Sequence, residues 1–208
     1  MKQEPLQLNR FAWKITGRTQ PGALPENWRI QLAARLGQRP RRIGVLAELA
    51  LFGALDCLDA AGESRLLKND LMRLVSLRGS RSAIFRTLEQ NRDDLPLPFS
   101  FLQSQTSQVL AALSVALNWQ GDASVILARD PMEVARLACH LADSNGMLLG
   151  WVEEEKPACS LWLRLAPCAL PSAEFVAASS FEQMVSVKTG YWRLGRAGLE
   201  IAHNSISE

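Results

Sequence analysis

The chain has 208 residues, of which 48% are hydrophobic and 21% are charged, and its formal net charge is +2. That length lets one domain bury a full core, and it does not require a second domain. Acidic and basic residues are interspersed along the chain, which argues against a general electrostatic affinity for nucleic acid.

The sequence predicts no membrane span and no secretion signal. Residues Met1 to Pro5 include no apolar segment, and charges interrupt the longest hydrophobic stretches well short of the length of a transmembrane helix. The four cysteines form no CxxC pair, which is typical of reduced thiols in a cytoplasmic protein. These cysteines are Cys57, Cys139, Cys159 and Cys168.

Strands and helices alternate along the first part of the chain. Alternating apolar residues predict a first strand, and Pro25 and Gly62 delimit the two helices that follow it. Up to residue 91 we expect a strand over 10–16, helices over 26–36 and 42–61, a strand over 71–77 and a helix over 80–91.

The alternation continues after a loop at Pro96 and Pro98. We expect a helix over 103–117, a strand over 123–128, a helix over 131–144, and strands over 147–152 and 159–165. Beyond Pro167 the pattern weakens to a loop over 171–180, then a helix and a strand or a hairpin over 181–187 and 191–201, and a frayed end. Helices between buried strands predict an α/β fold with a layered sheet.

The start of the helix over 131–144 has the strongest local pattern. Asp130 before Pro131, with Glu133 three residues later, is typical of an N-cap, a first-turn proline and a capping-box acid. We expect His140 on the exposed face of this helix. Its apolar stripe at helical spacing is expected to consist of Val134, Leu137, Ala138 and Leu141.

The residues themselves predict no catalytic, metal or cofactor site. Cys139 and His140 are adjacent on a helix, so their side chains diverge by about 100° and cannot form a nucleophile–base pair. Cys139 is therefore interpreted as a small core residue. The run Glu153-Glu-Glu155 between a strand and Pro157 indicates a solvated turn rather than a metal site. The glycines are too dispersed for a phosphate-binding loop.

The order of elements from residue 99 to residue 144 resembles a segment of β-ketoacyl synthases. There, a helix, a buried strand and a second helix deliver a catalytic Cys to a helix N-terminus, which lowers the thiol pKa and donates amide hydrogens to an oxyanion. In this chain Arg129 and Asp130 occupy that position. The wider resemblance, over residues 10–168, is to short chain-length factors of aryl polyene clusters, which are homologues of the N-terminal half of a ketosynthase. It is carried by Phe11-Ala-Trp13, Arg39-Pro-Arg-Arg42, Leu74-Val-Ser-Leu-Arg-Gly79, residues 99–117, Met147-Leu-Leu-Gly-Trp-Val152 and Leu161-Trp-Leu-Arg-Leu165.

The resemblance implies a layered, thiolase-like half-fold with a mixed, mostly parallel sheet and helices on its faces. Residues 1–168 would form the ketosynthase-like domain, and 169–208 a C-terminal extension packing on it. A chain-length gate would lie at Leu77, Arg78 and Ser80, with an ordinary surface turn as the alternative for Arg78. A strand would pair with its counterpart in a partner, unless it is an ordinary central strand; its residues are Ala123, Ser124, Val125, Ile126, Leu127 and Ala128.

The same resemblance implies a non-catalytic subunit that forms a heterodimer with a full-length ketosynthase and acts in polyene or fatty-acyl chain extension on an acyl carrier protein. Ketosynthases take two catalytic His residues from a C-terminal half, whereas this chain has only His140 and His203, and neither has a matching motif. The alternatives are a stand-alone acyl-transferring or hydrolytic enzyme with an unrecognised nucleophile, and a ketosynthase-derived scaffold. For the basic run Arg39 to Arg42, a solvated helix start and a docking surface for an acidic carrier protein both stay open.

Overall fold

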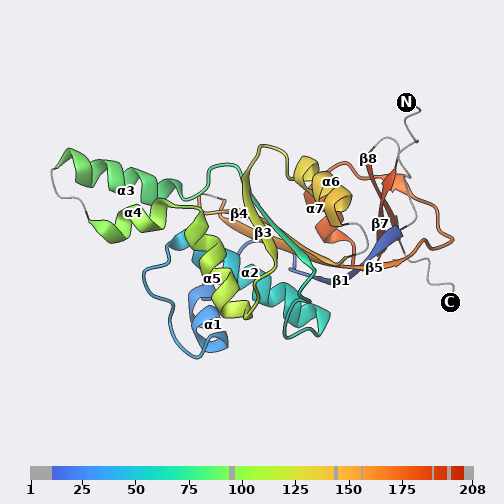
Figure 1. Cartoon of the computed structure of the whole chain (residues 1–208), viewed down its shortest axis with the longest axis horizontal. Coiled ribbons are helices and arrows are strands. Elements are labelled where there is room, and N and C mark those ends of the chain that lie inside the picture. The colour runs from blue at the N-terminus through green and yellow to red at the C-terminus, as the bar shows by residue number, and fades with distance from the viewer. Residues whose placement is uncertain are drawn as a thin grey trace.

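The protein is built on one eight-stranded sheet with the strand order β3-β2-β4-β5-β1-β7-β8-β6 (Figure 1). The computed structural model describes residues 11–93, 97–142, 145–155, 157–188, 190–195 and 198–203. The strands are β1 Phe11–Arg18, β2 Leu71–Ser76, β3 Asp122–Leu127, β4 Met147–Glu153, β5 Cys159–Ala169, β6 Val176–Ala177, β7 Gly190–Gly195 and β8 Gly198–His203.

The sheet is mixed as expected, but the expectation that it is mostly parallel is wrong, because five of its seven strand pairings are antiparallel. Its first five strands form one unit. Strand β2 is parallel to both β3 and β4, whereas β5 is antiparallel to β4 and to β1. Strands β1 to β4 therefore share one direction, and among these five strands only β5 opposes them. Strands β7, β8 and β6 extend the sheet beyond β1 by antiparallel pairing. This arrangement leaves β3 at one edge.

Helices cover both faces of the sheet, and two of them extend beyond it (Figure 1). Helices α1, α2 and α5 lie on one face, α6 and α7 lie on the other, and α3 and α4 pack against each other as a projecting arm. The helices are α1 Trp28–Arg35, α2 Val45–Ala61, α3 Arg81–Arg92, α4 Pro98–Ser104, α5 Ser107–Leu117, α6 Pro131–Ala142 and α7 Phe181–Ser186.

The elements predicted from the sequence are present, with four differences. Strand β6 lies within the loop expected over 171–180, where it pairs with β8. The single helix expected over 103–117 is wrong, because Gln105 adopts an extended conformation and separates α4 from α5. Strand β5 continues to Ala169 because β1 pairs with it over that length. The segment after residue 180 forms both a helix and a hairpin. The frayed end and the last turn of the expected helix over 131–144 fall in residues 204–208 and 143–144, outside the described residues.

Trp162 of β5 sets the spacing between the sheet and α2. Its side chain is fully buried, and its indole Nε1 donates to Ser160 Oγ at 3.0 Å. Gly150 on β4 and Gly53 on α2 both lie against this ring, and a Cβ at Gly150 would be 2.6 Å from Trp162 Cδ2. The two glycines are therefore required by the close approach of an indole, because interiors packed to this density have no room for an added methyl group.

We predict that Gly150→Ala lowers the free energy of unfolding by about 1 to 3 kcal/mol, the usual cost of overpacking a core. Urea denaturation followed by circular dichroism measures the change. Adding Trp162→Phe to this variant should give a smaller loss than the sum of the two single changes, because the smaller ring makes room for the methyl group. Strict additivity of the two losses would contradict the contact as the cause.

Candidate functional site

Strand β3 is an edge strand that has only β2 beside it in the described part of the chain. The six residues of β2 are all buried, whereas Asp122 and Leu127 of β3 are exposed and the four residues between them are half-buried. Residues 123–128 carry no charge. One side of the β3 backbone therefore presents hydrogen-bonding groups that no other described strand satisfies, which is the arrangement that allows another strand to add to a sheet.

A buried arginine fixes the first residue of β3. The Arg73 guanidinium on β2 donates to both carboxylate oxygens of Asp122, at 2.8 and 3.0 Å, and its side chain is 6% exposed. These hydrogen bonds hold the pKa of Asp122 below its usual value. Since Leu71 pairs with Asp122 and Ser76 with Leu127, the ion pair fixes the register along the whole strand.

The two faces of β3 have different surroundings. Ala123 and Val125 pack against the core beneath α5. Because strand residues alternate in direction, Ser124 and Ile126 point to the opposite face. Leu127, the last residue of the strand, has a side chain that is 59% exposed.

The helix that follows β3 begins as the sequence predicts. Asp130 Oδ1 accepts a hydrogen bond from Met132 N at 2.8 Å, and Pro131 is the first residue of α6. Both Arg129 and Asp130 are exposed. The capping-box role expected for Glu133 is wrong, because its carboxylate lies 2.6 Å from Arg136 Nη2 and forms an ion pair within α6 instead.

The predicted apolar stripe of α6 is also partly wrong. Leu137 and Leu141 are 49% and 53% exposed, although His140 lies on the exposed face as expected. The side chains that α6 buries against the sheet are small or β-branched, which lets the helix lie close to it. They are Pro131, Val134, Ala135, Ala138, Cys139 and Ala142.

The turn after β2 holds the three residues of the predicted chain-length gate. Two of them are exposed and one is buried. Leu77 is 45% exposed and Arg78 forms an ion pair with Glu155, but Ser80 is buried. Gly79 has a left-handed φ of 60°, and its amide donates to Ser76 Oγ at 2.8 Å. A Cβ at Gly79 would lie 3.2 Å from Leu127 Cδ2, so this turn contacts the exposed end of β3.

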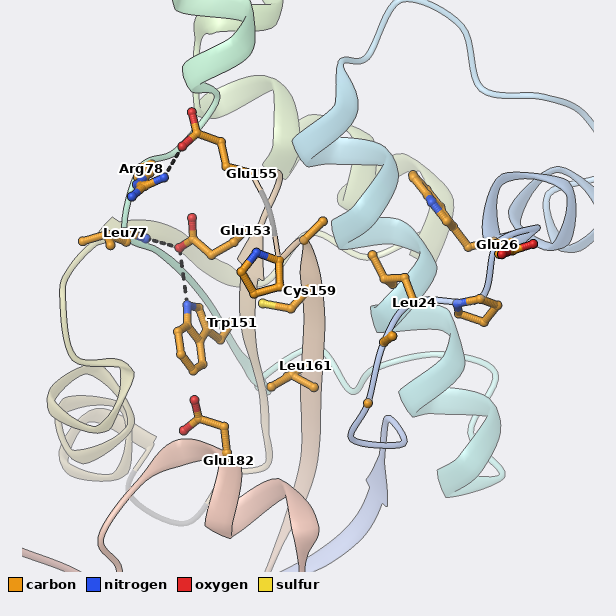
Figure 2. A pocket seen from close by; sticks show the side chains of 16 residues that line it. Leu24, Glu26, Leu77, Arg78, Trp151, Glu153, Glu155, Cys159, Leu161 and Glu182 are labelled. Atoms are coloured by element: carbon orange, nitrogen blue, oxygen red, sulfur yellow. Dashed lines mark hydrogen bonds and ion pairs between the residues drawn. The ribbon is translucent and has the colours of Figure 1, made fainter.

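The acidic run Glu153 to Glu155 holds this turn and is not a solvated segment as predicted. Glu153 Oε1 accepts hydrogen bonds from Leu77 N and from Trp151 Nε1 (Figure 2). Glu155 binds Arg78 and also approaches Arg81. Glu154 accepts from the amide of Ser82 at 2.5 Å, in the first turn of α3, where a carboxylate is favoured. The run thus joins the β4–β5 turn to the start of α3.

A pocket of about 800 Å³ opens beside this junction (Figure 2). Leu77 and Arg78 line it, whereas Ser80 does not. Its apolar wall includes Leu24, Trp28, Trp151 and Leu161, and its acidic residues are Glu26, Glu153, Glu155 and Glu182. The pocket can hold an apolar group. Its lining contains no histidine that could act as a base toward the one thiol present, that of Cys159.

The cysteines have no activated thiol. Burial raises the pKa of the Cys57 and Cys139 thiols above their usual value, and Cys139 lies in the core beneath α6 as predicted. Burial also raises the pKa of Cys159 to about 11, and that of Cys168 above its usual value. All four cysteines are free. Within the described residues, no three His, Cys, Asp or Glu side chains are grouped closely enough to hold a metal ion.

No described helix is both long enough and apolar enough to cross a membrane. Searches of protein-family models and of curated protein sequences give no match to this chain.

Solved structures, by contrast, resemble the chain over most of its length. One is a ketosynthase (ApeO) in complex with its chain length factor (ApeC) from Xenorhabdus doucetiae, with a TM-score of 0.53 and 15% identity, covering 95% of this chain and 99% of the matched one. Another is the ishigamide ketosynthase/chain length factor, with a TM-score of 0.52 and 14% identity. That match covers 70% of this chain and 48% of the other, so this chain spans about half its length. These similarities confirm the predicted thiolase-like, ketosynthase α/β fold.

We predict slow alkylation of Cys159 in the native protein. A rise in its pKa from 9.0 to about 11 lowers the thiolate fraction near pH 8 about a hundredfold. The rate with iodoacetamide should increase about tenfold per pH unit between pH 7 and 9, because the thiolate is the reacting form. Peptide mass spectrometry measures the rate, and the urea-unfolded chain is the control. Equal rates in the folded and unfolded chain would contradict the raised pKa.

Proposed function

We propose that this chain is a non-catalytic, chain-length-factor type subunit that pairs with a full-length ketosynthase in polyene or fatty-acyl chain extension. The acyl carrier protein would meet the chain as part of that complex, and an aryl polyene system is the setting that the sequence resemblance favours. The four free cysteines suit a cytoplasmic subunit. The fold similarity supports a ketosynthase-like partner role.

The observation that carries the proposal is the open edge of β3. A half-buried edge strand that is uncharged after its first residue and has an exposed apolar end is a liability for a monomer, because it can pair with any exposed strand. The position of β3 directly before Arg129 and Asp130 supports its use in pairing. In the ketosynthase arrangement, the corresponding strand joins the sheets of two subunits across the dimer.

The exposed apolar side chains of the arm formed by α3 and α4 are further evidence that the surface around the open edge of β3 is an interface. Leu127 touches the turn that leads into this arm, so the apolar surface continues from β3 onto it. Monomeric proteins seldom expose apolar side chains at this density. Seven large apolar side chains of the arm and its connection are at least 41% exposed: Ile84, Phe85, Leu88, Leu97, Phe99, Phe101 and Leu102.

The vacated nucleophile position supports a non-catalytic role. Arg129 and Asp130 occupy the start of α6, and Asp130 uses its carboxylate as the helix cap. The raised pKa values of the four thiols disfavour the alternative of a stand-alone enzyme with a cysteine nucleophile. For the chain-length gate, the lining of the pocket favours Leu77 and Arg78, whereas the buried position of Ser80 makes it a structural residue of the turn.

We predict that Ile126→Lys and Leu127→Lys abolish pairing with the ketosynthase and leave the chain folded. Each places an ammonium group in the proposed interface, where burying it without a partner charge is costly. In the isolated chain the long lysine side chain can reach solvent from these partly exposed positions. Co-expression with full-length ketosynthases of the source genome, followed by size-exclusion chromatography, measures pairing, and circular dichroism measures folding.

Two further variants serve as controls for this experiment. Leu170→Lys makes the same change at a 42% exposed leucine just beyond the end of β5, and should leave co-elution intact. Val125→Lys faces the core of the chain itself and should lower its melting temperature. Normal co-elution of folded Ile126→Lys and Leu127→Lys would contradict pairing through β3.

We also predict that the purified chain acquires no acyl group from an acyl carrier protein thioester and does not decarboxylate a malonyl thioester. The buried thiols contain too little thiolate to attack either substrate at neutral pH. Intact-protein mass spectrometry checks the first result, and product analysis checks the second. Stoichiometric acylation that disappears in Cys139→Ala or Cys159→Ala would identify a nucleophile and refute the non-catalytic assignment.

A further inference from the structure

We propose that a second surface of this chain docks an acidic amphipathic helix of a partner protein. This surface, the basic groove, lies between α5, the first half of α2 and the connection that precedes α2. Its volume is about 580 Å³, which is in the range of small binding clefts. The groove shares no lining residue with the pocket beside Leu77 and Arg78.

The apolar surface of the basic groove, which we call its floor, is shallow and includes exposed side chains of α5. It is formed by Ala111, Ala112, Val115 and Ala116 of α5, with Leu51 of α2 behind them. Val115 is 82% exposed, which is the highest value of any large apolar side chain among the described residues. Three alanines around one exposed valine allow a second helix to approach closely, since the distance between packed helices depends on side-chain size at the contact.

The rim of the basic groove is positively charged. Arg41 lines the groove and Arg39 is two residues before it, and both are exposed. Within the described residues, neither guanidinium has a carboxylate within 4.0 Å. Arg35, at the opposite end of the connection, is instead neutralised by Asp56 at 2.9 Å and Asp59 at 3.4 Å. Helix α5 carries no charge at all, so nothing on the floor opposes the rim arginines.

An acidic amphipathic helix matches both features. Apolar side chains at every third or fourth position would cover Val115 and the alanines, and carboxylates beside that stripe would meet Arg39 and Arg41. A single-stranded nucleic acid fits less well, because the groove lining has no aromatic side chain on which a base could stack. The adjacent Arg42 already lies over the Phe99 ring, 4.3 Å from its centroid, and is not directed at the groove floor. Arg39 to Arg42 would then be a docking surface and not only a solvated helix start.

The test is a fluorescence-anisotropy titration of the full chain into a labelled helical peptide of about 16 residues, with leucines at every third or fourth position and glutamates elsewhere. We expect saturable binding that weakens as salt increases, because the rim charges are exposed. The double variant Arg39→Glu/Arg41→Glu should weaken binding about tenfold or more. Val115→Asp should weaken it as well, since this change places a charge on the apolar floor. Lys14→Glu, an exposed charge reversal on β1 outside the groove, should bind like the unchanged chain.

Four results would overturn the proposal: no saturable binding, equal weakening by Lys14→Glu, equal binding of a peptide with glutamine in place of glutamate, and full displacement by a single-stranded oligonucleotide. Co-elution of the same variants with the ketosynthase is measured by size-exclusion chromatography. The groove variants should still co-elute with it. Failure of the unchanged chain to co-elute would count against the proposed function alone, and failure of peptide binding would count against the groove alone.

Discussion

The buried ion pair between Arg164 of β5 and Asp70, the residue before β2, determines where two strands, β2 and β4, begin. Arg164 Nη2 lies 2.8 Å from Asp70 Oδ2, and both side chains are at most 4% exposed. Asp70 also accepts hydrogen bonds from the amides of Leu67 and Gly146, the latter just before β4. Charges removed from water are tolerated only when they are paired and hydrogen-bonded, and loss of one partner leaves the other charge uncompensated. The pair therefore ties the starts of β2 and β4 to β5.

The remaining geometry of the site depends on that alignment. Because β2 and β4 start level, their carboxyl ends also coincide, and Glu153 at the end of β4 reaches the amide of Leu77 after β2. The second buried guanidinium, that of Arg73 on β2, binds the Asp122 carboxylate and so fixes the register of β3 relative to β2. Arg164 and Arg73 thus determine the position of the open edge. Each lies within a strand and binds an aspartate at or next to the first residue of another strand.

Local patterns in the sequence located the helix and strand boundaries that depend on local chemistry. Gly62 ends α2 in a left-handed conformation, and Asp130 caps α6. The errors concern contacts between distant segments. The helical spacing of apolar residues in α6 does not show which side of the helix packs against the sheet. The prediction therefore places Leu137 in the buried stripe, whereas its side chain is exposed. Glu153 and Leu77 are 76 residues apart, so no local sequence pattern could predict that the acidic run accepts hydrogen bonds from the turn after β2. The edge position of β3 is likewise a property of the whole strand order.

The two edges of the sheet are treated differently, and the difference bears on the proposed function. Beyond β1 the chain adds β7, β8 and a final strand, β6, of only two residues. A very short edge strand presents few free backbone hydrogen-bonding groups to another chain, and it is a common protection against unwanted strand pairing. The opposite edge has six residues, no charge from 123 onwards and no covering strand in the described part of the chain. A two-residue strand at one edge and a six-residue strand at the other favour β3 as the proposed pairing side, and partner binding there would stabilise the folded chain by mass action.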